Sequence, residues 1–203
     1  MTTHVATATS RPAVPAGIPN SLVLLFAFCC GAIVANIYYA QPLIELIAPD
    51  VGLSSHAASF IVSLTQVGYA IGLLFLVPLG DLTENRRLMI ITLLVSAASL
   101  VGAALSGQPG TFLVFSMLIG FSSVSVQMMV PLAAHMATDE TRGRVVGSVM
   151  SGLLFGILLS RPLSGLVADH FGWRTVFAAA AVLMLAIVGL AGLTMPRPRP
   201  APH

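Results

Sequence analysis

Six long apolar runs constrain the fold of this chain more than any other feature of its sequence. They span about residues 21–47, 57–80, 87–106, 111–136, 145–167 and 175–195. Each exceeds the roughly 20 residues that a helix needs to cross the hydrocarbon core of a bilayer. A run inside lipid must be a helix or a barrel strand, and barrel strands have about 10 residues of alternating polarity. The runs therefore predict an all-α integral membrane bundle of six helices.

Charge is scarce enough for lipid to be the main solvent. Only 8% of the residues are charged, whereas soluble domains carry roughly 25%. Residues 1–20, rich in Pro, Thr and Ala, are predicted to be a disordered cytoplasmic N-terminus, 21–195 the six-helix domain, and 196–203 a cytoplasmic tail of Pro and Arg. The histidines show no ligand spacing and both cysteines lie in an apolar run, so we expect no metal, cofactor or disulfide.

Arginine placement predicts the orientation of the chain. With a cytoplasmic N-terminus, seven arginines fall on the cytoplasmic side and only Arg174 on the far side, while Arg161 lies inside a run. Cytoplasmic loops carry such an excess of basic residues. We therefore expect both termini in the cytoplasm and the bundle in a bacterial inner membrane; the scattered arginines indicate no nucleic-acid partner.

Polar residues are distributed unevenly over the six runs. The first, second, fourth and fifth runs carry them, whereas the third and sixth are almost wholly apolar and are expected to face lipid. This period of three predicts two inverted three-helix repeats. Candidates for a substrate path are Asn36, Tyr39, Gln41, Gln66, Tyr69, Gln127 and Arg161. The alternative for most of them is hydrogen bonding between helices.

A charged motif, VPLGDLTENRR, ends the second run. It resembles the loop between helices two and three of the major facilitator superfamily, with Asp81 at the family's Asp, and Arg86 and Arg87 at its basic pair. Val77 stands at the family's first Gly, and the arginines lie one residue further along than usual. A second copy, GLVADHFGWR, follows the fifth run, and its matching residues are Gly165, Asp169, Gly172 and Arg174.

The fifth run also resembles a glycine-rich motif of antiporters in the same superfamily. The matching glycines are Gly147, Gly156 and Gly165. Ser160, Arg161 and Ser164 stand where that motif has Gly, Pro and Gly, so antiport does not follow. GYAIG, GRVVG and GLLFG are small-xxx-small spacings, which let helices approach closely. The stretch NIYYAQPL is similar to an efflux-type branch of the superfamily.

The resemblance implies one six-helix half of a secondary transporter that exports a small organic molecule by alternating access. It also implies a cytoplasmic gate in which Asp81 pairs with Arg86, Arg87 or Arg144; the alternative is a solvated loop whose arginines set topology. Because superfamily members usually have twelve helices, we expect a half-size or truncated chain that needs a second half or a second copy. The alternatives are a non-transporting assembly partner, an inactive half or, on weaker grounds, an intramembrane enzyme.

Arg161 leaves two interpretations open. As a cavity or gate charge it would bind an anionic or polar part of the substrate. Alternatively, its side chain snorkels to the outer membrane interface, where an arginine is inexpensive. The uncharged Gln and Tyr candidates suit an uncharged or amphipathic ligand.

Overall fold

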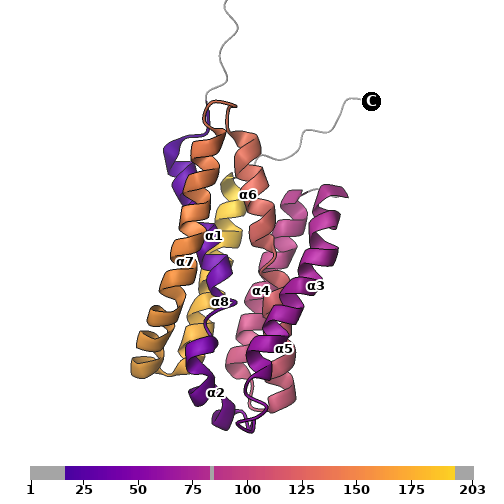
Figure 1. Ribbon diagram of the computed structural model, residues 1–203, viewed down its shortest axis with the longest axis vertical. Helices are drawn as coiled ribbons and strands as arrows, with labels where there is room; N and C mark the ends of the chain where they lie inside the picture. Colours follow the sequence, from indigo (N-terminus) through magenta and orange to yellow (C-terminus); the bar gives the residue numbers. More distant parts are fainter. Residues whose placement is uncertain (1–16, 83–84, 195–203) are drawn as a thin grey trace, which may run out of the picture.

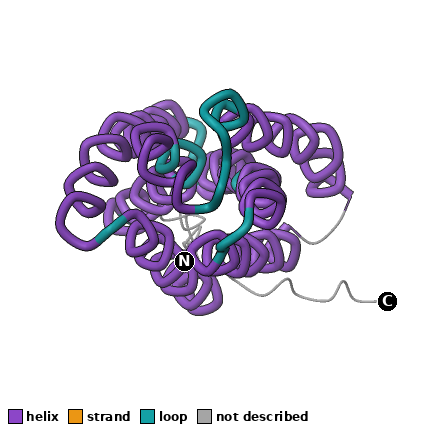
Figure 2. Tube along the Cα trace, turned by 90° about the horizontal axis from the view of Figure 1, so that it is seen from below, coloured by secondary structure: helices purple, strands orange, loops and turns teal. Residues whose placement is uncertain are grey.

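The computed structural model describes residues 17–82 and 85–194, so the predicted tails fall outside it apart from residues 17–20. The described chain is helical between short loops and contains no strand (Figures 1 and 2). Its helices are α1 (Asn20–Ala35), the short 3₁₀ helix η1 (Gln41–Leu43), α2 (Ile44–Asp50), α3 (Phe60–Leu82), α4 (Asn85–Leu105), α5 (Pro109–Ser122), α6 (Ser125–Met136), α7 (Arg142–Phe171) and α8 (Trp173–Thr194). The predicted all-α fold is confirmed.

Five stretches of helix in the described chain are long and apolar enough to cross a membrane. They are Phe60–Gly80, Arg86–Leu105, Pro109–Met136, Arg142–Phe171 and Trp173–Leu193. The first predicted run differs, because α1 has only 16 residues and the chain continues through turns into η1 and α2. The N–H of Asn36 bonds the carbonyl of Ile33, which tightens the last turn, and Pro42 then removes a backbone donor. The first span is therefore a broken helix.

Helix pairing shows the predicted inverted repeat. The most extensive contacts join α1 to α7, α3 to α5, and α4 to α8. In an inverted repeat, α1, α3 and α4 of the first unit correspond to α5–α6, α7 and α8 of the second. Exchanging the two units therefore turns the pair α1–α7 into the pair α5–α3. The same exchange leaves the pair α4–α8 unchanged. In Figure 1 α1, α7 and α8 lie on one side of the bundle and α3 and α5 on the other.

The crossing of α1 and α7 depends on small residues. A Cβ atom built on Gly156 would collide with the backbone of Gly31, and one on Gly152 would collide with Ala27. Two helix backbones can approach this closely only where at least one of the two facing residues is a glycine, which has no side chain. The GLLFG spacing of the sequence is thus a helix contact.

The equivalent pair, α3 and α5, crosses in the same way. A Cβ on Gly68 would meet the carbonyl of Met117, and one on Gly120 would meet the carbonyl of Thr65. The GYAIG spacing therefore also marks a close contact. The third spacing, GRVVG, does not, because added Cβ atoms at Gly143 and Gly147 meet nothing within 4 Å.

Candidate functional site

An arginine stands at the break in the first span. Arg161 of α7 donates from Nη2 to the Oε1 atom of Gln41 over 2.7 Å, and its guanidinium lies 5.8 Å from the ring centre of Tyr38. The side chain is otherwise exposed. Two residues that follow α1, one in a turn and one in η1, thus hold a charged side chain that retains free N–H groups.

The depth of Arg161 follows from its position in α7. The midpoint of this 30-residue helix lies between residues 156 and 157, so Arg161 is 4.5 residues, or about 7 Å, beyond it at 1.5 Å per residue. Because half the hydrocarbon core measures about 15 Å, this distance places Arg161 within the core, on the side of its midplane where α7 ends. A polar group at this depth is expected to face protein or water.

A second polar pair lies across the bundle. The Nε2 of Gln127 in α6 donates to the hydroxyl oxygen of Tyr69 in α3 over 2.9 Å. Tyr69 is the tenth of the 23 residues of α3, so this pair also lies close to mid-span. Gln127 is exposed, as is Gln66 one turn earlier on α3. We call Gln41, Gln66, Tyr69, Gln127 and Arg161 the polar face.

Two predicted path residues lie elsewhere. Asn36 is 3% exposed, and its Nδ2 donates to the Oγ of Ser96 over 3.4 Å and to the Sδ of Met184 over 3.2 Å. It therefore links the first span to α4 and α8 near their midpoints, as expected of hydrogen bonding between helices. Tyr39 is half-buried and lines an apolar groove instead of joining the other polar residues.

That groove lies between α1, α7 and α8 and has a volume of about 510 Å³. Exposed apolar side chains such as Leu24, Phe28 and Phe155 form much of its wall. Its two serines, Ser160 and Ser164, donate to carbonyls of their own helix over 2.8 and 3.0 Å. The groove therefore offers a ligand almost no free polar group, and the polar face is the better candidate for a substrate path.

Serines elsewhere in the spans behave in the same way. The hydroxyls of Ser116, Ser122 and Ser151 donate to carbonyls one turn earlier in their own helices over 2.8 to 2.9 Å. A hydroxyl that is satisfied in this way costs little inside a membrane helix. The serines that suggested a cavity in the fourth and fifth runs are thus explained largely without one.

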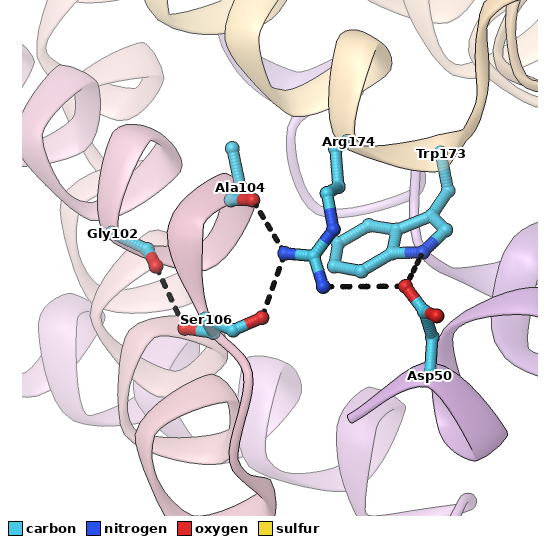
Figure 3. A network of polar contacts seen from close by, with 6 residues as sticks. All are labelled: Asp50, Gly102, Ala104, Ser106, Trp173 and Arg174. Carbon is cyan, nitrogen blue, oxygen red and sulfur yellow. Dashed lines mark hydrogen bonds and ion pairs between the residues drawn. The ribbon is translucent and has the colours of Figure 1, made fainter. Parts of the chain in front are cut away.

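At the end of the bundle where α8 begins, Arg174 contacts α4, α2 and its neighbour Trp173 (Figure 3). Its Nη1 donates to the carbonyls of Ala104 and Ser106, over 2.8 and 2.7 Å, where α4 ends. Its Nη2 pairs with the Oδ2 of Asp50 over 3.2 Å, and that oxygen also accepts the indole N–H of Trp173 over 3.0 Å. The guanidinium lies 4.4 Å from the Trp173 ring centre. Arg174 therefore caps α4 and ties it to α2 and α8.

Arg86 makes the reciprocal contact at the other end of the same helix pair. Its Nη2 donates to the carbonyl of Gly192, near the end of α8, over 2.8 Å. Arg86 is the second residue of α4, as Arg174 is the second residue of α8, and each follows its motif's Asp by five positions. In this antiparallel pair the N-terminus of one helix lies beside the C-terminus of the other, where a cation is favourable. We call these two contacts the arginine clamps.

The structure places the other motif residues apart. Arg87 is exposed on α4, and Arg144 donates to the Oδ1 of Asn20 over 3.2 Å. Asp169 is exposed on α7, and the side chain of Asp81 lies outside the described residues. An added Cβ on Gly165 meets nothing within 4 Å, so this glycine is not at a helix crossing. The gating role of the motif stays a prediction.

Sequence reasoning missed the clamps and the two partners of Arg174, namely Asp50 and Trp173. A usable signal was present, because the Asp-to-Arg spacing is the same in both motif copies. It did not reveal which group each arginine would contact, because every residue has a backbone carbonyl and the sequence therefore does not indicate which one accepts the bond.

Together these observations define a class: a polytopic helical membrane protein built as an inverted repeat. The sequence profile of the Major Facilitator Superfamily matches residues 23–203. The chain therefore belongs to this superfamily of membrane transporters, and the alternative of an intramembrane enzyme is set aside.

Individual relatives of the chain are also named as transporters. The chain is 48% identical over 171 residues to the uncharacterized transporter YgaY of Escherichia coli O157:H7, across 84% of this chain and 43% of that protein. It is 30% identical over 177 residues to the inner membrane transport protein YnfM of E. coli K12, across 84% of this chain and 42% of that protein. The solved inward-open xylose transporter XylE of E. coli shares its fold, with a TM-score of 0.66 and 22% identity over 87% of this chain and 48% of that one. The aligned region thus spans less than half the length of each of these proteins.

Proposed function

We propose that this six-helix unit is one half of a secondary transporter that exports a small organic molecule across a bacterial inner membrane by alternating access. The polar face carries the proposal. It places polar side chains near mid-span on an exposed surface of the bundle, where lipid would be a costly neighbour. The names of the two relatives support transport, and that of YnfM, an inner membrane transport protein, supports the inner membrane.

The burial of the helices supports the same assignment. In the most apolar stretch of α7, 17% of the residues are buried, and in that of α3, 28% are buried. In the corresponding stretch of α4, 50% are buried. The two least buried spans thus include carriers of the polar face, Arg161 on α7 and Gln66 on α3. Polar surface on an uncovered helix is expected where a second half meets the first around a substrate path. That half would come from further sequence, a separate chain or a second copy.

A combined flux and assembly measurement tests the proposal. The chain is expressed in a bacterial host, and the cellular accumulation of a panel of organic acids, amines and neutral compounds is measured by mass spectrometry. Reduced accumulation of at least one compound, reversed in Asp81→Asn at equal membrane level, is the expected result. Unchanged accumulation of every compound, together with a monomer in mass spectrometry that retains complexes, would favour the inactive-half alternative.

The same cells test the orientation. A fluorescent protein fused to either terminus should be protected from external protease, because both termini are proposed to be cytoplasmic. Cleavage at either terminus in intact cells would reverse that part of the proposal.

A further inference from the structure

We infer that Arg161, Gln41 and Tyr38 form an anion-binding site for the carboxylate of an amphipathic organic anion. This inference rests on the proposed function and names its substrate class. It decides between the two ligand types that the sequence leaves open, an uncharged and an anionic one.

The charge of Arg161 is not neutralised within the described chain. Its hydrogen-bond acceptor, the amide oxygen of Gln41, is neutral. The ion pairs of the described residues join Arg142 to Asp139 and Arg174 to Asp50, not Arg161 to a carboxylate. Of the seven acidic residues in the sequence, only Glu45 falls within a predicted apolar run. A cation at this depth without a counter-ion is expected to serve an anionic ligand.

The geometry holds the guanidinium ready for such a ligand. One Nη2 hydrogen is used by Gln41 and the cation lies over Tyr38, so two contacts restrict the side chain. The remaining N–H groups of this exposed side chain form the planar fork that matches a carboxylate. The two prolines beside the site, Pro42 and Pro162, limit the backbone on both sides.

The apolar part of the ligand has a surface to lie on. Leu158 and Leu154 precede Arg161 by three and seven positions, so all three share one face of α7. These leucines are 68% and 62% exposed. A ligand with its carboxylate on Arg161 and its apolar body on the leucines would point inward from the site, toward mid-span.

Snorkelling explains these contacts less well. An arginine that reaches for the outer interface would extend along its helix toward Phe171, where α7 ends. Instead the guanidinium is held beside the break in the first span, by Gln41 and Tyr38. A break in an α-helix at membrane depth is tolerated where it is covered by protein or lines a water-filled cavity.

A binding experiment with matched acids and amides tests the site. Radiolabelled benzoate is bound to the purified chain in detergent, and unlabelled benzoate, benzamide, 4-butylbenzoate and 4-butylbenzamide compete with it. We expect the acids to compete and the amides not to, with 4-butylbenzoate the stronger acid. Equal competition by acid and amide would overturn the inference, as would displacement only by short-chain phosphatidylglycerol, which would make the occupant a lipid phosphate.

Variants locate the binding. Arg161→Gln should weaken benzoate binding by about tenfold or more, because bonds to a charged donor are the stronger class. Arg161→Lys should keep part of the affinity, and the matched control Arg142→Gln, which removes an exposed charge at the other end of the same helix, should keep all of it. Wild-type affinity in Arg161→Gln would refute the site. If that variant does not fold, Gln41→Leu decides, since it frees the guanidinium and should weaken binding several-fold.

The binding assay needs no transport, so the two proposals can fail separately. A chain that binds benzoate but moves nothing would contradict the proposed function alone. A chain that exports only neutral compounds would contradict the anion site alone.

Discussion

The arginine clamp formed by Arg174 makes a quantitative prediction about stability. In Arg174→Met the apolar stem of the side chain can still cover Trp173, but every hydrogen bond and the charge are lost. The two bonds to helix-end carbonyls belong to the charged class, worth about 1.5–3 kcal/mol each when buried. The Arg174 side chain is 41% exposed, so about 1 kcal/mol each is the better figure. The half-exposed pair with Asp50 adds roughly 0.2–1 kcal/mol.

These terms sum to a loss of about 2–3 kcal/mol, or roughly 4–12 °C in the unfolding midpoint at 2–4 °C per kcal/mol for a chain of this size. The assay is thermal unfolding in detergent, followed by fluorescence. Trp173 is the only tryptophan of the chain, so its emission reports directly on the clamp.

The matched control is Arg87→Met, which removes an exposed arginine for which the structure shows no contact. It should change the midpoint by about 1 °C or less, as surface substitutions do. Arg86→Met, which removes the bond of the other arginine clamp to the carbonyl of Gly192, should have an unfolding midpoint between those of the two variants. If Arg174→Met unfolds at the same temperature as Arg87→Met, the clamp contributes nothing and the argument from its geometry fails.

Three further predictions follow from the packing and the motif. Gly156→Val should lower the unfolding midpoint by an amount equivalent to about 1–3 kcal/mol or more, because its Cβ collides with Gly31; an unchanged midpoint would contradict the close crossing. Gly147→Ala, with open space around it, should leave the midpoint unchanged or slightly raised, and a large loss would show that this glycine touches something. Asp81→Asn should reduce export while leaving membrane insertion intact, as judged by flux and by the amount of folded protein; equal flux would remove the gate.

The sequence was sufficient to predict five of the six spans, the repeat, and close helix contacts at two of the three small-xxx-small spacings. The length of an apolar run is almost enough by itself to predict a membrane-spanning helix. GYAIG and GLLFG indicate close helix contacts because glycine has no side chain to separate two backbones. The break after Ala35 was not foreseen, since the apolar run continues through it and only Pro42 hints at a boundary.

Side-chain partners were harder to predict than helices. Asn36 and Gln41 are both amides in the first span, yet one links buried helices and the other supports an arginine on an open face. Their sequence neighbourhoods do not distinguish them, because the distinction depends on which helix lies opposite. Arg86 and Arg174 likewise bind backbone carbonyls, for which any residue type would serve.

The account depends most on whether the polar face meets water within the membrane. Cysteine accessibility measures this directly, in a background with Cys29 and Cys30 replaced by alanine. Gln127→Cys and Gln66→Cys should react with a charged, water-soluble methanethiosulfonate in native membranes. Val182→Cys, 68% exposed on the almost wholly apolar α8, should stay unreactive because it faces lipid. Reaction at the first two alone supports a substrate path; equal reaction at all three, or at Val182→Cys alone, would contradict it.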